Sequence, residues 1–140
     1  MTFDLSLLDE AELRGYIEFD QNRTRITYHC GRQYTDDFNN PEEAVRAFVY
    51  SWLIIDKGYP VNRIEVEHTV PRRQPSDRAD IVLFSDDARS NPYLVVEVKQ
   101  ERCSQIQWQQ AIEQGFGNAN SLRTTNYLLI DKGQESILFD

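Results

Sequence analysis

The residues best suited to chemistry lie in one short apolar segment of the second half of the chain. In Leu94-Val-Val-Glu-Val-Lys99, a carboxylate and an ammonium group interrupt a run of aliphatic residues. Glu97 and Lys99 are two positions apart, so in a β-strand their side chains share one face of the sheet. A strand that is apolar on both faces is usually covered on both, and charges buried there are costly unless they pair or bind a ligand. The segment therefore predicts a functional site or a structural ion pair.

A second carboxylate stands next to a neighbouring β-branched run. Asp80 begins a run of Ile, Val, Leu and Phe, and the segments 80–84 and 93–99 are expected to pair as antiparallel central strands. If they pair, Asp80, Glu97 and Lys99 meet at one end of the sheet. Two carboxylates and the Val98 backbone carbonyl are the hard oxygen ligands that Mg²⁺ prefers, and a lysine beside them can stabilise a developing negative charge. The alternative is a structural ion pair of Lys99 with either carboxylate.

The remaining sequence predicts the elements that must position these residues. Alternating and helical hydrophobic periodicities, bounded by turn residues, indicate a short helix, a hairpin, a long helix, a strand, the two central strands, a second long helix and a closing hairpin. The corresponding ranges are Leu5–Leu13, 15–20 with 24–30, 41–57, Ile64–Val70, 80–84, 93–99, 105–122, and 127–130 with 136–139. This order predicts an α/β (α+β) fold with a mixed sheet flanked by helices.

Both long helices have recognisable starts. Asn40 is a suitable N-cap before Pro41 at the first helical position, and Ser104 opens a capping box before the second helix. Gly115 and Gly117 interrupt the second helix, and each is expected to weaken it by up to about 1 kcal/mol relative to alanine.

Length and charge narrow the classes of protein. The 140 residues suit one domain, and no apolar run is long enough for a transmembrane helix. The lack of a signal peptide and the presence of only two cysteines, Cys30 and Cys103, predict a cytoplasmic protein with free thiols. The net charge of −8 argues against a free-standing nucleic-acid binder, although residues 1–43 carry ten acidic against four basic side chains and hold most of the excess.

Four motifs together resemble a known nuclease family. They occur in the order and with the spacing of the amino-terminal nuclease domain of type I restriction enzyme R subunits, a member of the PD-(D/E)XK superfamily. The motifs are Pro41-Glu-Glu-Ala-Val-Arg46, Gly58-Tyr-Pro60, Arg78-Ala-Asp-Ile-Val82 and Val95-Val-Glu-Val-Lys99. The resemblance covers residues 36–140 as a nuclease core, with 1–35 as a variable region of the same single domain, 1–140. It implies a restriction-endonuclease-like central mixed sheet and Mg²⁺-dependent cleavage of double-stranded DNA, with Mn²⁺ as a possible substitute.

The resemblance also assigns roles to residues. It implies that Asp80 and Glu97 ligate the metal, with the Val98 carbonyl beside them, and that Lys99 is the catalytic lysine. Glu43 matches an acid of the first helix that holds a metal-bound water, but a glutamate at the third helical position also caps a helix without any catalytic role.

Other candidate residues carry weaker signals. Gln114 matches a family glutamine that helps to place the substrate, whereas Asn118 stands where the family has a tyrosine. Arg72, Arg73 and Arg78 form a basic cluster that could contact phosphates or could line a solvated loop.

Several kinds of site are not expected. His29 and His68 lack metal-ligand spacing with each other or with the cysteines, so a zinc site is not expected. Cys103 has no convincing histidine partner for nucleophilic catalysis. No phosphate-binding Gly-Lys-Ser/Thr motif occurs, so the chain has no ATP site.

The sequence thus favours a DNA endonuclease module of a type I restriction system. The resemblance implies double-stranded DNA, a helicase-like motor, and methylation and specificity subunits as partners, with a homodimer as a further possibility and no membrane. Two alternatives stay open: a catalytically silent interaction domain on the same fold, and a nuclease acting on RNA or branched DNA.

Overall fold

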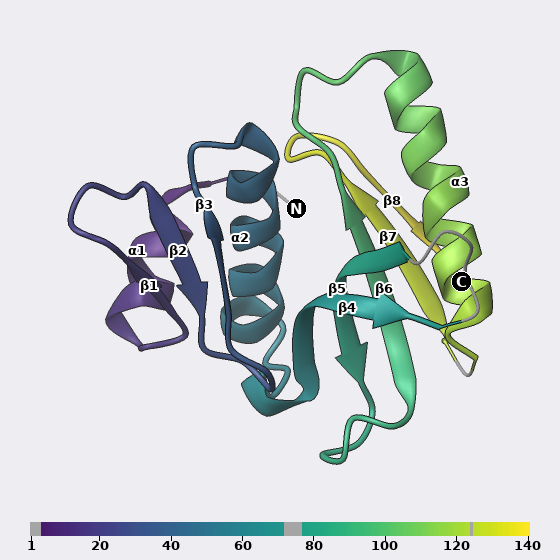
Figure 1. Ribbon diagram of the computed structural model, residues 1–140, viewed down its shortest axis with the longest axis horizontal. Helices are drawn as coiled ribbons and strands as arrows, with labels where there is room; N and C mark the ends of the chain where they lie inside the picture. Colours follow the sequence, from purple (N-terminus) through teal and green to yellow (C-terminus); the bar gives the residue numbers. More distant parts are fainter. Residues whose placement is uncertain (1–3, 72–76, 124) are drawn as a thin grey trace.

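The computed structural model describes residues 4–71, 77–123 and 125–140 (Figure 1). The mixed α/β fold expected from the sequence is confirmed. In chain order the elements are α1 (Ser6–Leu13), β1 (Ile17–Phe19), β2 (Arg25–Tyr28), β3 (Tyr34–Asp37), α2 (Pro41–Ser51), the π-helical turn η1 (Trp52–Asp56), the 3₁₀ turn η2 (Val61–Arg63), β4 (Ile64–Val70), β5 (Asp77–Phe84), β6 (Pro92–Val98), α3 (Gln105–Ser121), β7 (Tyr127–Asp131) and β8 (Ser136–Phe139).

The strands form two separate sheets. β1, β2 and β3 make a small antiparallel sheet, and β4 to β8 make a five-stranded sheet in sequence order. Within the large sheet only β6 and β7 run parallel, because α3 carries the chain back across the sheet between them. The expected antiparallel pairing of the central strands, β5 and β6, is confirmed.

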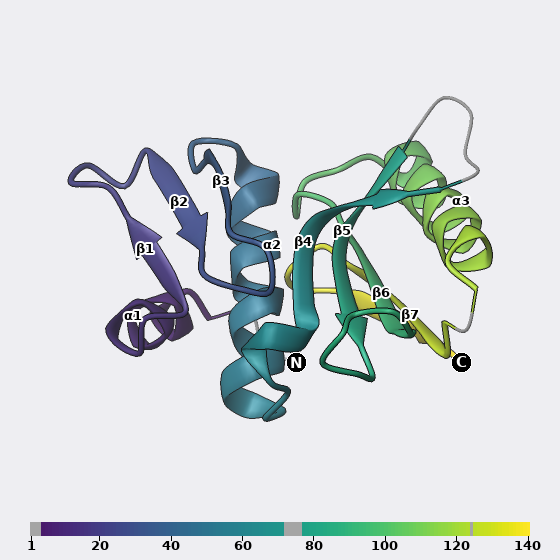
Figure 2. The ribbon, with the colours of Figure 1, turned by 60° about the horizontal axis from the view of Figure 1, so that its bottom comes forward.

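The helix α2 stands between the two sheets, whereas α3 covers the opposite face of the large sheet (Figures 1 and 2). One core joins α1, the small sheet, α2 and one face of the large sheet, and a second core lies under α3. Because α2 has packing partners on several sides, all its residues from Val45 to Ser51 are buried. The predicted burial of β6 on both faces is confirmed, since Leu94 to Val98 are all buried.

Both predicted helix starts are confirmed. The Asn40 side chain accepts a hydrogen bond from the backbone N–H of Glu42 at 3.0 Å. At α3, the backbone N–H of Gln107 donates to Ser104 Oγ at 3.1 Å, and the backbone N–H of Ser104 donates to Gln107 Oε1 at 2.9 Å. These bonds fix where each helix begins, and therefore which side chains each presents to the strand ends.

Gly115 has a packing function that its low helix propensity did not suggest. A Cβ atom at this position would lie 2.7 Å from Ile130 Cδ1, 3.0 Å from Leu128 Cδ1 and 3.3 Å from Glu97 Cγ. The glycine therefore lets α3 approach β6 and β7 closely at the level of Glu97.

Two features of the strands were not expected from the sequence. The strand β3 adds to the amino-terminal hairpin, which forms its own sheet instead of joining the central one. The strand β5 begins at Asp77, three residues before the apolar run.

The expected free thiols are confirmed at Cys30 and Cys103. Over the parts of the chain that the structure describes, no helix is long and apolar enough to cross a membrane.

Candidate active site at the ends of the central strands

The carboxyl groups of Asp80 and Glu97 meet where β5 and β6 lie side by side. The pairing of Ile81 with Val96 places the two acids at adjacent positions of neighbouring strands. The backbone N–H of Val98 donates to Asp80 Oδ2 at 2.8 Å. The side chain of Glu97 is itself a hydrogen-bond partner of Asp80. The convergence of these two carboxylates is therefore built into the strand register.

Burial raises the pKa of Asp80 to about 6, although hydrogen bonds with the Val98 N–H and Glu97 and the positive charge of Arg46 lower it. The Asp80 side chain is 17% exposed, so it has lost most of its hydration. Asp80 therefore holds a proton more readily than an exposed aspartate does, and burial is the main cause.

Glu97 is oriented by a side chain from α3. It is 4% exposed, and its Oε1 accepts a hydrogen bond from Asn118 Nδ2 at 2.6 Å. Asn118 is fully buried, and its Nδ2 also approaches the Arg78 carbonyl at 3.5 Å. Its Oδ1 finds no hydrogen-bond partner among the described residues. The asparagine at the family's tyrosine position thus contacts the second acid directly.

Next to this pair lies a set of four carboxylates around one guanidinium, which we call the acidic cluster: Asp36 of β3, Glu43 of α2, Glu67 of β4 and Asp80 of β5. Arg46 of α2 lies among them and is 3% exposed. Its Nη2 is 2.7 Å from Glu43 Oε1 and 3.0 Å from Asp36 Oδ2, and its Nη1 is 2.5 Å from Glu67 Oε1 and 3.7 Å from Asp80 Oδ1. Burial opposes the charge of the guanidinium, but hydrogen bonds with Glu43 and the other negative charges raise the pKa of Arg46 above its ordinary value.

Glu43 does not serve as a helix cap in this structure. The N-cap hydrogen bond of α2 comes from Glu42, whereas Glu43 Oε2 accepts hydrogen bonds from the Tyr28 hydroxyl at 2.5 Å and from Arg46 Nε at 2.9 Å. Both of its carboxylate oxygens are therefore engaged within the protein.

Lys99 lies immediately after β6 and is half-buried. Its backbone N–H donates to the Asp131 carbonyl at 2.9 Å. Burial raises the pKa of Glu42, while the positive charge of Lys99 lowers it, so the ammonium group lies within electrostatic reach of the start of α2. Within the described residues no ion pair of Lys99 is seen, so the alternative of a structural pair with Glu97 or Asp80 gains no support from this structure.

A small polar cavity of about 90 Å³ opens at this point. It is lined by the acidic cluster, Arg46, Val98, and two residues of the α2 start, Asn40 and Glu42. The positive charge of Lys99 lowers the pKa of Glu42, the helix acid next to the Glu43 that the sequence singled out.

The other predicted site residues differ in how far they are exposed, and two of them lie outside the described residues. Gln114 lies on α3 one turn before Asn118 and is half-buried. Arg72 and Arg73 lie outside the described residues. Arg78 has a side chain that is 62% exposed, and its Nη1 is 3.9 Å from Glu67 Oε2.

Sequence reasoning missed Arg46, Glu67 and Asp36. The spacing of Glu43 and Arg46, three residues apart on one helix, was an available signal for an ion pair. Glu67 has φ +57°, a left-handed conformation within a strand, and no sequence pattern predicted this conformation.

Whether these residues suit a divalent metal depends on their donor chemistry. In residues 4–71, 77–123 and 125–140, no three His, Cys, Asp or Glu side chains are arranged as a ready-made metal site. Mg²⁺, however, commonly takes one or two carboxylates and fills its other positions with water and substrate oxygens. The contacting carboxyls of Asp80 and Glu97 beside Val98 fit that requirement, and the orphaned Asn118 Oδ1 shows that this region has spare acceptor capacity.

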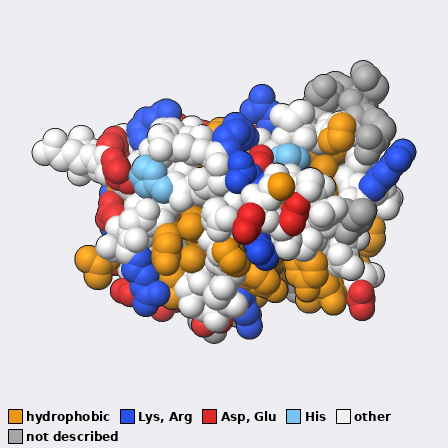
Figure 3. All heavy atoms as spheres, turned by 90° about the horizontal axis from the view of Figure 1, so that it is seen from below, with side chains coloured by type: hydrophobic (Ala, Val, Ile, Leu, Met, Phe, Trp, Pro, Cys, Tyr) orange, Lys and Arg blue, Asp and Glu red, His pale blue; other side chains and the backbone are white. Residues whose placement is uncertain are grey.

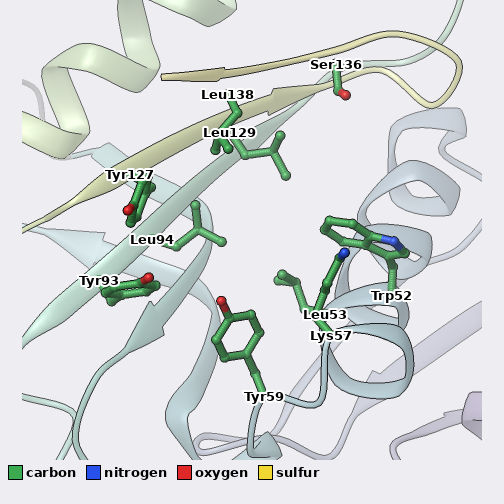
Figure 4. A pocket seen from close by; sticks show the side chains of 10 residues that line it. All are labelled: Trp52, Leu53, Lys57, Tyr59, Tyr93, Leu94, Tyr127, Leu129, Ser136 and Leu138. Atoms are coloured by element: carbon green, nitrogen blue, oxygen red, sulfur yellow. The ribbon is translucent and has the colours of Figure 1, made fainter. Parts of the chain in front are cut away.

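A larger cavity has different chemistry. It encloses about 500 Å³ between η1 and the strands β6 to β8, and it is lined mainly by aromatic and aliphatic side chains (Figure 4). Tyr59, Tyr93 and Tyr127 form one wall, and Lys57 lies 5.1 Å from the ring of Trp52 on the other. Its lining residues include no carboxylate, so it lacks the acidic oxygen ligands of the polar site.

The fold and the polar site define a mixed α/β domain in which two acids lie opposite each other on two central antiparallel strands. Residues 41–140 match the family model of the type I restriction enzyme R protein N terminus, and the chain belongs to this family. None of the curated proteins matches the sequence. Membership makes the chain part of the amino-terminal region of a restriction enzyme R subunit, a class of nucleases.

Proposed function

We propose that this chain is a metal-dependent endonuclease module that hydrolyses phosphodiester bonds of double-stranded DNA within a type I restriction system. The observation that carries the proposal is the contact between Asp80 of β5 and Glu97 of β6, with Lys99 two residues after Glu97, in a chain of this family. Burying two contacting carboxyls is costly, and a divalent cation would repay that cost.

Each residue has a definite task in this proposal. The carboxylates of Asp80 and Glu97, with the Val98 carbonyl, would hold Mg²⁺. The ion would lower the pKa of a bound water and neutralise charge on the phosphate. Lys99 would donate hydrogen bonds to the attacking water or to a phosphate oxygen, since no carboxylate of the described residues pairs with it. Gln114, one turn from Asn118, would help to place the substrate.

The partners follow from the restriction system. DNA recognition would come from specificity subunits, DNA movement from a helicase-like motor, and the protein would act in the cytoplasm. Mixed basic and acidic side chains on the face shown in Figure 3 agree with a module that relies on other subunits to grip DNA.

The first test measures metal binding by calorimetry. Mn²⁺ is titrated into the wild type in the presence of a short DNA duplex that supplies phosphate ligands. Saturable binding is expected for the wild type and loss of binding for Asp80→Asn. The matched control is Asp87→Asn, which alters an exposed aspartate paired with Arg63. Absence of binding in a folded wild type would contradict the proposal and favour a silent interaction domain.

The second test measures cleavage of plasmid DNA with Mn²⁺. Lys99→Ala should abolish cleavage while stability is maintained, because this lysine has no ion pair to lose. Lys57→Ala is the control, since Lys57 lines the apolar cavity away from the acids. If Lys99→Ala cleaves as well as the wild type, Lys99 is not catalytic.

A further inference from the structure

The acidic cluster already contains a cation, the guanidinium of Arg46. Its two terminal nitrogens reach carboxylates on four different elements, at 2.5 to 3.7 Å. The same guanidinium carbon lies 5.8 Å from the ring centre of Tyr28 and 5.4 Å from that of Tyr34. Arg46 is therefore held by the small sheet, α2 and the large sheet together.

The charges of the cluster are not balanced by this one cation. Four carboxylates surround the buried guanidinium of Arg46, and the exposed Arg78 approaches one of them, with its Nη1 3.9 Å from Glu67 Oε2. Arg46 and Glu43 are 3% and 5% exposed, so water provides little screening for the pair. Glu67 reaches Arg46 from a left-handed backbone position, which costs a non-glycine residue energy that the contact must offset. The polar cavity beside Arg46, about 90 Å³, is large enough to hold water.

We propose that Arg46 is a positioning residue that acts as the resident cation of the acidic cluster and competes there with a divalent metal. Arg46 holds Glu43, Glu67 and Asp36 more closely than it holds Asp80, and so leaves Asp80 as the member of the cluster most available to a metal. The acids that Arg46 holds most closely are thereby closed to a metal, and a metal binds at Asp80 and Glu97 instead. The inference deepens the proposed function, because it explains which acids of this site bind the metal.

The acids of the cluster differ in how closely Arg46 holds their oxygens. Glu43 gives both oxygens to Arg46 and one of these also to Tyr28, so it has no oxygen free of a charged or hydroxyl donor. Glu67 Oε1 accepts the shortest contact to Arg46, at 2.5 Å. Asp80 is the most distant, at 3.7 Å, and its other oxygen binds the Val98 N–H. Asp80 is thus the acid that Arg46 restrains least.

The test compares Arg46→Met with the wild type by Mn²⁺ calorimetry on the metal-free chain without DNA. Methionine keeps most of the length and removes the charge, so the cluster loses its cation. Arg46→Met should bind Mn²⁺ about tenfold or more tightly than the wild type, because an ion in the low-dielectric cluster gains several unpaired carboxylates. Addition of Mn²⁺ should also raise the melting temperature of Arg46→Met by more than that of the wild type.

Arg46→Lys provides a second measurement if Arg46→Met does not fold without metal. Lysine keeps the charge but not the fork of donors that reaches four carboxylates, so its Mn²⁺ affinity should lie between the other two. Arg63→Met, at an exposed ion pair with Asp87, should leave Mn²⁺ binding unchanged. A purely structural arginine would affect the melting temperature alone, so unchanged or weaker Mn²⁺ binding in the folded variants would overturn the inference.

Failure of this inference differs from failure of the proposed function. If the wild type binds Mn²⁺ through Asp80 and the Arg46 variants bind it no more tightly, the inference falls and the proposed function stands. If the wild type binds no Mn²⁺ and Arg46→Met gains a site, the proposed function falls and the role of Arg46 as the resident cation stands.

Discussion

Asn118 fixes the orientation of Glu97 although it is remote from it in sequence. The asparagine is fully buried and donates to Glu97 Oε1 at 2.6 Å. Residues that orient a metal-ligating carboxylate commonly affect metal affinity by about 10- to 100-fold. The position that departs from the family pattern is therefore expected to matter for the metal site.

We expect Asn118→Leu to weaken Mn²⁺ binding by about tenfold or more, because leucine has a similar shape but cannot hold the glutamate. Calorimetry on the folded variant measures this. Asn120→Leu, on an exposed position of the same helix, should bind Mn²⁺ as the wild type does. Equal affinities for the two variants would show that Glu97 does not need Asn118, or that it does not bind the metal.

Asp131, at the end of β7, predicts a pH dependence of stability. It is fully buried; burial raises its pKa to about 6, and the hydrogen bond from the Gly133 N–H opposes this shift. Its Oδ2 has no partner among the described residues. A carboxyl group with a raised pKa in the folded state stabilises the protein below about pH 4, and this contribution is lost as the pH rises through about 6.

Asp131→Asn should therefore gain free energy of unfolding relative to the wild type as the pH rises from about 4 to 7. Amide and protonated carboxyl are both neutral, so the two proteins should be closest in stability at low pH. Urea unfolding at several pH values measures the difference. A difference that does not change with pH would mean that the pKa of Asp131 is the same in the folded and unfolded states, so that burial does not raise it.

At the scale of elements, the contact of α3 with β6 depends on Gly115. Its absent Cβ would lie 2.7 Å from Ile130 Cδ1 and 3.3 Å from Glu97 Cγ. Alanine normally favours a helix over glycine by about 1 kcal/mol, whereas overpacking a core costs roughly 1–3 kcal/mol. The two effects act in opposite directions at this position.

Gly115→Ala should therefore destabilise the protein by up to about 2 kcal/mol in urea unfolding, despite its better helix propensity. Asn120→Ala, on the exposed side of α3, should instead stabilise it by a few tenths of a kcal/mol. If Gly115→Ala is the more stable protein, Ile130 and the helix have enough freedom to accept the methyl group.

The elements that the sequence predicted best are those with local signals. The cap at Asn40 and the capping box at Ser104 are encoded within four residues, and the strands β5 and β6 are marked by β-branched runs. The strand β3 was missed because Tyr34-Thr-Asp-Asp is short and polar; it forms because β2 supplies its hydrogen bonds. The contacts of Arg46 and Asn118 could not be predicted, since they join elements far apart in sequence and depend on how α2 and α3 pack.

At the scale of the whole molecule, charge limits how the chain can hold DNA. The net charge is −8, and on the face shown in Figure 3 basic and acidic side chains are interspersed. Some arginines form ion pairs within the protein and are not free to bind phosphate. Arg46 is buried in the acidic cluster, Arg63 pairs with Asp87, and Arg89 pairs with Glu65. Affinity for duplex DNA depends on the number of phosphates that basic side chains neutralise.

We therefore expect the isolated chain to bind a short duplex weakly and with a shallow salt dependence. Two phosphate contacts correspond to about a tenfold loss of affinity between 50 and 200 mM salt, whereas six to ten contacts correspond to about 10³- to 10⁵-fold. Fluorescence anisotropy with a labelled duplex, in Ca²⁺ to prevent cleavage, measures the slope. A loss of about tenfold or less is expected, because the net charge is −8 and several arginines of the described residues are engaged within the protein. A loss near 10³-fold would instead require a basic surface of at least six phosphate contacts on this chain, and DNA binding would then not depend on other subunits.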